Sequence, residues 1–196
     1  MAGSLIALAV VGLIVLVALV LIFWAIGIYN RLVTLRQGVD ASWAQIDVQL
    51  KRRYDLIPNL VETVKGYATH EKGTFEAVTN ARAACLGAQK LGPGGAGQLA
   101  QAEGMLTSAL KTLFAVAEAY PQLKANENFL QLQGQLGETE NLVAGRRGGY
   151  NETVREYNTQ TQLFPASIVA GMFGFTQRSY FEVENPEERI APKVKF

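Results

Sequence analysis

The feature that most constrains this chain is an apolar stretch of 24 uncharged residues from Leu5 to Ile28, in which only Gly12 and Gly27 fall outside the apolar set. As a helix rising 1.5 Å per residue it would be about 36 Å long, and the hydrocarbon core of a bilayer is about 30 Å thick. The stretch therefore predicts a membrane-spanning helix, marked along its length by Leu5, Leu13, Leu21 and Ile28.

A cleaved signal peptide is the competing interpretation, because residues 25–27 loosely resemble a small-x-small cleavage site. Signal peptides place a basic segment before an apolar stretch of about 7 to 15 residues. Here residues 1–30 contain no Lys or Arg and the apolar stretch is longer, so we expect it to be retained as an anchor. Trp24 and Tyr29 lie near its end, where amphipathic rings favour the headgroup layer.

The basic residues predict an orientation. None precedes the apolar stretch, whereas Arg31 and Arg36 follow it immediately and residues 51–53 add three more. Because Lys and Arg near a span remain on the cytoplasmic side, the N-terminus is expected outside and the rest of the chain in the cytoplasm. Trp24, Tyr29, Arg31 and Arg36 are then the interfacial anchors.

All of the charged residues, 18 basic and 17 acidic, lie in residues 31–196, which are enough for one domain of ordinary size. The net charge of +1 argues against a dedicated nucleic-acid binder. A single cysteine, Cys85, excludes an intrachain disulfide and is consistent with a reducing compartment.

Apolar residues recur every three or four positions after the span, which predicts helices. The first continues out of the membrane to about residue 68, with a kink or short break near Tyr54 to Pro58, since proline lacks an N–H donor. Others are expected at about 71–90, 98–119 and 122–163, with Thr69 as a helix cap and Pro121 as a break. Only residues 179–184 have a pattern that suits an extended chain.

The expected fold is all-α: an N-terminal transmembrane helix (1–30) continues into a cytoplasmic up-down-up-down antiparallel helical bundle (31–164), followed by a membrane-proximal apolar segment and a short irregular or extended tail (165–196). In this topology the turns near Thr69 and Pro121 lie far from the bilayer. The uncharged residues 166–175 lie near it, where they could enter the interface, pack on the bundle or meet another subunit. The candidate contacts are Ile168, Val169, Met172, Phe173 and Phe175.

Motifs for catalysis are incomplete. Gly92, Gly94 and Gly97 match G-x-G-x-x-G, but a helical stretch precedes them instead of a buried strand, which favours a flexible linker. His70, the only histidine, precedes Glu71 but lacks the second His of H-E-x-x-H. The acidic residues are spaced like solvated helix faces. We therefore predict no catalytic residue, metal or cofactor, and no enzyme.

Polar residues interrupt the apolar seam of the last long helix at three places, namely Thr139 or Glu140, Arg146 or Arg147, and Thr161. A seam Arg must be paired or reach water, and Asp47, Asp55 and Glu140 are available partners. We interpret the seam Arg as part of an ion pair that fixes the register between helices, and a contact site for another molecule is the alternative. The basic run 51–53 would lie about 30 Å from the bilayer and is interpreted as solvated charge or a subunit contact.

These features resemble the LemA family of bacterial membrane-anchored helical proteins. The resemblance includes Tyr29-Asn30, residues 39–43, the run 52–61 and residues 180–182, and its motif positions are Arg53, Asp55, Pro58, Asn59, Tyr150, Asn151, Tyr157, Asn158, Phe164 and Pro165. It implies a single span of the bacterial inner membrane with a cytoplasmic helical bundle. The family includes a protein involved in building magnetosome membranes, but it supplies no catalytic residues.

We therefore expect a non-enzymatic scaffold that contacts membrane lipid, self-assembles as a homo-oligomer on the inner leaflet, and organises membrane or recruits another membrane protein. The alternative is an adaptor or regulatory subunit of a membrane protease or signalling complex. An enzyme would require a polar pocket with perturbed carboxylates inside the bundle.

Overall fold

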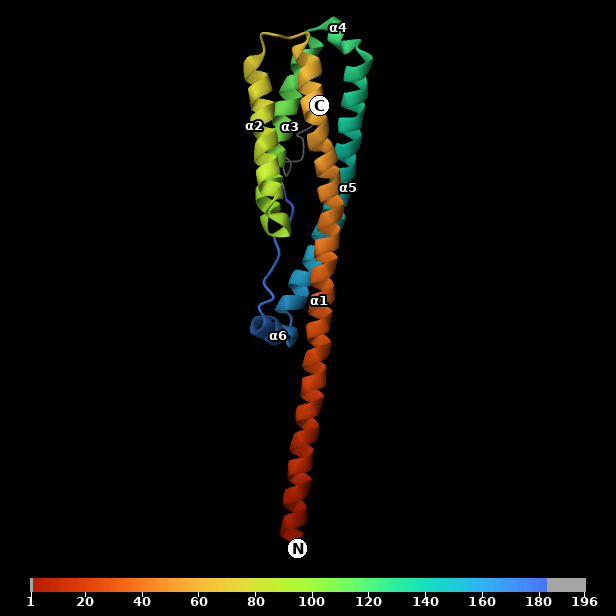
Figure 1. Cartoon of the computed structure of the whole chain (residues 1–196). Coiled ribbons are helices and arrows are strands. Elements are labelled where there is room, and N and C mark those ends of the chain that lie inside the picture. Colours follow the sequence, from red (N-terminus) through yellow and green to blue (C-terminus); the bar gives the residue numbers. More distant parts are fainter. Residues whose placement is uncertain (1, 183–196) are drawn as a thin grey trace, which may run out of the picture.

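The computed structural model describes residues 2–182, and every regular element in them is a helix. The elements are α1 (Ala2–Lys65), α2 (Lys72–Gln89), the short 3₁₀ helix η1 (Gly92–Gly95), α3 (Ala96–Glu118), α4 (Pro121–Lys124), α5 (Glu127–Gln162) and α6 (Ala166–Phe173). The long helices run alternately up and down, with α1 beside α5 and α2 beside α3 (Figure 1). The expected all-α antiparallel bundle is confirmed.

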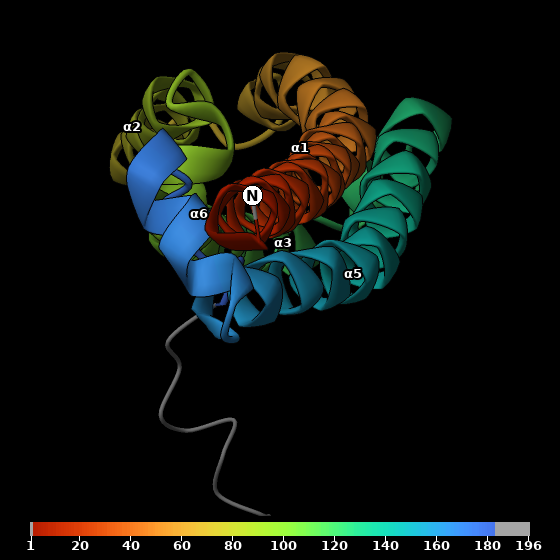
Figure 2. The same ribbon diagram turned by 90° about the horizontal axis from the view of Figure 1, so that it is seen from below.

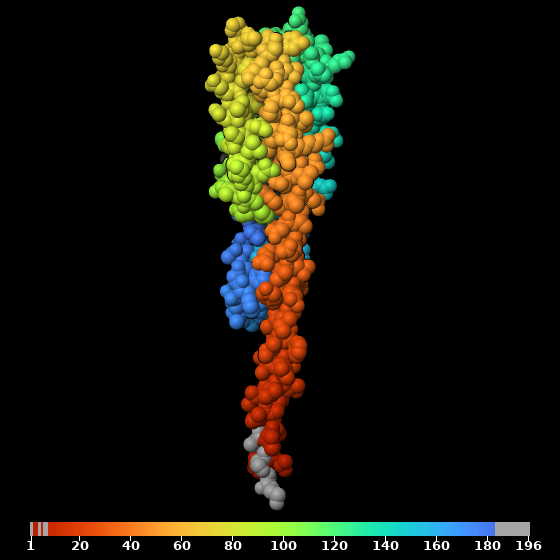
Figure 3. All heavy atoms as spheres, viewed as in Figure 1, coloured from red at the N-terminus to blue at the C-terminus, as the bar shows by residue number. Residues whose placement is uncertain are grey.

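The 64 residues of α1 form one continuous helix that serves both as stem and as bundle helix. It contains an 18-residue window of mean hydropathy 3.1, none of it buried, and within residues 2–182 it is the one helix long and apolar enough to cross a membrane. Leu5, Leu13 and Leu21 are 68%, 60% and 56% exposed, whereas Leu32 is fully buried. The apolar part accordingly projects as a narrow stem beyond α6 (Figure 3).

The helix passes Pro58 without a break, so the predicted interruption near Tyr54 is wrong. Proline at position 58 deprives the carbonyl oxygen of Tyr54 of its usual helical donor. The Nε of Arg82, on α2, donates to this carbonyl oxygen at 2.7 Å. A side chain from the neighbouring helix therefore replaces the missing hydrogen bond and allows α1 to continue.

Other differences concern helix ends. Thr69 is not a cap, because α2 begins later, after Glu71, and has no side-chain capping bond. Residues after Pro121 form the separate turn α4, and α5 begins only after Asn126, whose side chain accepts a hydrogen bond from the Phe129 N–H at 3.0 Å. Residues 179–182 have no regular structure, and the rest of the expected extended segment, 183–184, lies outside the described residues.

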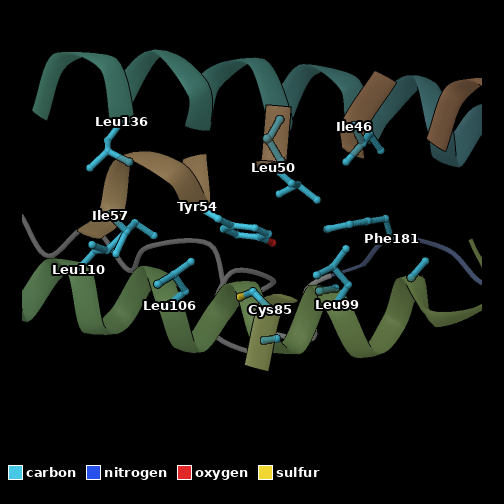
Figure 4. Packing of buried hydrophobic residues seen from close by; sticks show 14 of the residues in the cluster. Ile46, Leu50, Tyr54, Ile57, Cys85, Leu99, Leu106, Leu110, Leu136 and Phe181 are labelled. Carbon is cyan, nitrogen blue, oxygen red and sulfur yellow. The ribbon is translucent and has the colours of Figure 1, made fainter. Parts of the chain in front are cut away.

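The core follows the apolar seams of the helices. On α5 buried residues recur every seven positions at Leu136, Val143, Tyr150 and Tyr157, the spacing of a coiled-coil seam. The core lies between these residues, α1, and the inner faces of α2 and α3 (Figure 4). Thr139 and Thr161 are buried in the seam. Each hydroxyl donates to a backbone carbonyl oxygen of its own helix at 2.8 Å, so neither needs a partner from another helix.

The turns lie at the ends of the bundle that the predicted up-down-up-down topology gives them. The α1–α2 turn and α4 lie at the end far from the N-terminus, whereas η1 and α6 lie towards it (Figure 1). The uncharged segment 166–175 is mostly helix α6, which is seen end-on in Figure 1 and lengthwise in Figure 2, so it lies across the axis of α1.

Candidate functional site

The first candidate site is an uncharged surface where α6 meets the apolar part of α1. The ring of Tyr29 contacts Phe173 and Phe175 edge-on, with centroid distances of 4.9 and 5.5 Å. Beside it is an apolar pocket of about 330 Å³, whose α1 wall is Ile22, Ala25, Ile26 and Tyr29 and whose α6 wall is Val169, Met172 and Phe173. Thus α6 lies at the level where the predicted span ends.

The segment 166–175 packs on its own bundle, one of the three alternatives predicted for it, and leaves an apolar face uncovered. Val169 and Phe175 are buried, at 5% and 7% exposure, so the segment packs on its own bundle. Ile168, Met172 and Phe173 are 55%, 74% and 59% exposed and present an apolar face. The preceding motif residue Phe164 is 80% exposed and is joined to Pro165 by a cis peptide bond.

The expected interfacial anchors lie around this surface. Trp24 is 50% exposed on the stem, and Arg31 is exposed two residues beyond Tyr29 of the pocket wall. Ile28 is partly buried against the bundle core. The guanidinium of Arg36 lies over the ring of Phe175 at 5.2 Å, a cation–π contact that links α1 to the chain leaving α6.

The two Tyr-Asn pairs of the family motif fasten residues 175–182, which we call the strap, to α5. The Asn158 side chain donates to the carbonyl oxygen of Arg178 at 2.9 Å and accepts from its N–H at 2.8 Å. Asn151 makes the same pair of bonds with Phe181, at 3.2 and 2.8 Å. Each Asn amide therefore holds one strap residue as a neighbouring β-strand would.

The seven-residue spacing of these pairs has a geometric cause. Seven residues of α-helix advance about 10.5 Å. The strap residues that they hold are three apart, and three extended residues span about 10 Å. The tyrosines show the same correspondence between seven residues of helix and three of strap. The hydroxyl of Tyr157 donates to the carbonyl oxygen of Thr176, and that of Tyr150 to the carbonyl oxygen of Ser179, both at 2.9 Å.

The strap joins α6 to the middle of the bundle. The hydroxyl of Tyr150 also reaches the carbonyl oxygen of Pro93 in η1, at 3.3 Å, and burial raises the pKa of Tyr150 to about 12. Trp43 contacts the rings of Tyr150 and Phe181, with centroid distances of 5.5 and 6.1 Å. Asp40 of α1 lies 3.7 Å from Arg178. These contacts attach α6 to the bundle at a defined position.

The second candidate site is a polar cluster inside the bundle, and it corrects one sequence interpretation. Arg53 is not solvated charge or a subunit contact, because its side chain is only 3% exposed. Its Nη1 donates to Oε2 of the fully buried Glu103 at 2.5 Å, and its Nη2 donates to the hydroxyl of Thr107 at 3.2 Å. Glu103 was missed, although its place between Leu99 and Leu106 on the apolar face of α3 signalled a buried charge.

Tyr54 and Cys85 complete this cluster, side by side in the core (Figure 4). The Tyr54 hydroxyl donates to Oε1 of Glu103 at 2.5 Å. Burial and then the negative charge of Glu103 raise the pKa of Tyr54 well above its usual range. The same two causes raise the pKa of Cys85 to about 12, so its thiol is protonated and unreactive at neutral pH.

The seam arginines differ from each other. Arg146 is exposed and donates to Oε1 of Gln45 on α1 at 2.9 Å. Arg147 is half-buried, and its guanidinium lies 4.6 Å from the centre of the Phe181 ring. Burial lowers the pKa of Arg147. The acidic partner expected among Asp47, Asp55 and Glu140 is not seen for either arginine within the described part of the chain.

The remaining predicted positions lie on the surface. Asp55, Pro58 and Asn59 of the motif are exposed on α1. The Gly-rich residues 92–97 follow a helix and form η1 and the start of α3. No group of three or more His, Cys, Asp or Glu residues that could hold a metal occurs in residues 2–182.

The architecture defines a class of protein: an antiparallel helical bundle carried on a long apolar N-terminal helix. Residues 42–196 match the profile of the LemA family, and the chain belongs to this family. Similar proteins are magnetosome protein MamQ 2 of Paramagnetospirillum magneticum, 28% identical over 175 residues, and magnetosome protein MamQ of Magnetospirillum gryphiswaldense, 27% identical over 174 residues. These alignments cover 79% and 78% of this chain. The chain spans 64% of the length of each relative.

Proposed function

We propose that this LemA-family protein is a single-span, non-enzymatic membrane scaffold whose bundle stands on the cytoplasmic leaflet of a bacterial inner membrane and assembles side by side with further copies. The observation that carries the proposal is the uncharged surface shared by α6 and the end of the apolar part of α1. It supplies a second contact with the bilayer beside the span itself.

The energetics favour placing this surface in the membrane. Fully removing a large apolar side chain from water contributes about 1.5–3 kcal/mol. The exposed side chains of Phe164, Met172 and Phe173 would all gain from the interface, and α6 lies across the span, as an interfacial helix does. With Arg31 and Arg36 on the bundle side, the positive-inside rule assigns that side to the cytoplasm.

Two contacts with one leaflet hold the bundle upright and leave its sides available to neighbours. The exposed face of α1 carries a groove in which Val48, 63% exposed, lies among both acidic and basic side chains, namely Asp47, Lys51, Arg52 and Asp55. A surface with both signs of charge can complement its own copy. A second groove, between α2 and α3, is lined by Ala77, Ala81, Ala84 and Ala109, small residues that permit close helix approach.

The test is the mass of the full chain in mild detergent and in lipid nanodiscs over a range of concentrations. We expect concentration-dependent oligomers, weakened by Val48→Asp on the α1 groove. Leu130→Asp, at an exposed position on α5, is the matched control and should leave assembly unchanged. A monomer at every concentration would refute the scaffold. If that monomer cross-linked in cells to one other membrane protein, the adaptor function would replace the scaffold function.

A further inference from the structure

A cleft of about 360 Å³ opens between α3 and α5, directly over the buried Arg53–Glu103 pair. Its α3 wall presents Lys111 and the hydroxyls of Thr107 and Ser108, and its α5 wall presents Arg147. The scaffold function makes no use of this cleft, which shares no residue with α6 or with the α1 groove and only Ser108 with the groove between α2 and α3.

The charges in the cleft do not cancel. Glu103 is neutralised, because one carboxylate oxygen accepts from Arg53 and the other from Tyr54, each at 2.5 Å. Glu140 stands at the rim, 55% exposed, with its Oε2 3.9 Å from Nη2 of Arg53. Neither Lys111 nor Arg147 forms an ion pair with any residue in 2–182. The cleft therefore retains positive charge.

Two arginines that line the cleft each have an unused guanidinium donor. The Nε atoms of Arg53 and Arg147 are both buried without a hydrogen-bond partner in the described part of the chain. Arg53 is only 3% exposed, so solvent screens its charge poorly. Burial lowers the pKa of Arg147, which means that its cation has lost solvent without gaining sufficient opposite charge.

We propose that this cleft binds a small soluble anion through an oxyanion group, either phosphate or carboxylate. Arg147 and Lys111 supply the charge, Arg53 lines the floor, and the hydroxyls of Thr107 and Ser108 supply further hydrogen bonds. Arg groups recognise such oxyanions by paired, charge-assisted hydrogen bonds. A lipid headgroup does not fit this place, because Arg53 is 22 residues beyond Arg31 on one helix, about 33 Å from the predicted membrane surface.

The test uses the full chain in neutral detergent, titrated with inorganic phosphate and separately with malonate at constant ionic strength. Affinity is measured by calorimetry, and thermal unfolding is followed by circular dichroism. We expect saturable binding of at least one probe and a rise in melting temperature that saturates with it. Arg147→Met should weaken binding by about tenfold or more, since it removes a charged donor.

Arg146→Met is the matched control, because Arg146 is the adjacent residue but lies outside the cleft and contacts Gln45. It should bind as the unmodified chain does. Lys111→Met changes an exposed residue, so it tests the cleft without disturbing the core, and it should also weaken binding.

Two results would overturn the proposal. The first is no saturable binding of either probe, and the second is equal loss of affinity in Arg146→Met and Arg147→Met.

Discussion

Glu103→Gln tests the claim that a buried ion pair organises the middle of the bundle. The pair has an N–O distance of 2.5 Å, and its side chains are 3% and 0% exposed. Removing one partner of a buried pair costs about 3–5 kcal/mol, because the other charge remains desolvated. Glutamine still offers an acceptor to Tyr54, and Glu140 stays near Arg53, so we expect a loss at the lower end, about 3 kcal/mol.

The double change Arg53→Met with Glu103→Gln should recover most of that loss. It removes both charges and leaves a neutral core of similar volume, for which we expect a net loss of about 1 kcal/mol. Glu138→Gln is the control, because Glu138 pairs with Arg52 at 3.6 Å with both side chains at least 50% exposed, and it should change stability little.

The assay is urea denaturation of the full chain in detergent, followed by tryptophan fluorescence in a Trp24→Phe background, so that the signal comes from Trp43, which is 6% exposed in the folded state. The free energy of unfolding comes from the midpoint and slope of each transition. A loss below about 1 kcal/mol for Glu103→Gln, the range of exposed pairs, would refute the reasoning. So would a double variant less stable than the single one.

Three further predictions concern the continuity of α1, the core thiol and the depth of α6. Arg82→Met should lower stability in urea by about 1–2 kcal/mol, and by less in a Pro58→Ala background, where the helix regains its own donor; equal losses would contradict the replacement. Because the pKa of Cys85 is raised from 9.0 to about 12, the stability it contributes is fully present below pH 9 and is lost as the pH rises towards 12. Cys85→Ala should lessen the fall of the urea midpoint over that range, and the native thiol should resist a thiol reagent at neutral pH until the chain unfolds. A polarity-sensitive fluorophore on Met172→Cys in liposomes should emit further to the blue than one on Val48→Cys; matching spectra would place α6 in water.

The local pattern of residues predicts much of the architecture. An uncharged run and a three-or-four-residue apolar period depend only on neighbours along the chain, so the long apolar helix and the order and direction of the long bundle helices follow from them. The ends of the helices were less well predicted. The apolar pattern predicts a helix from about residue 122, whereas α5 begins only after its cap residue, Asn126.

The candidate sites depend on partners that are distant in the sequence. Arg53 looks like part of a solvated basic run until α3 brings Glu103 to it, across 50 residues. Pro58 looks like a helix break until Arg82 of α2 supplies a donor.

By itself, then, the sequence determined that this chain has an apolar stem, a helical bundle and an uncharged segment near the stem. Only the tertiary structure decided which charges are buried, why α1 is unbroken, and how two Tyr-Asn pairs hold the strap and thereby α6. The physical reason is that helical periodicity is a local property. Burial and hydrogen-bond pairing depend instead on which surfaces the folded chain brings together.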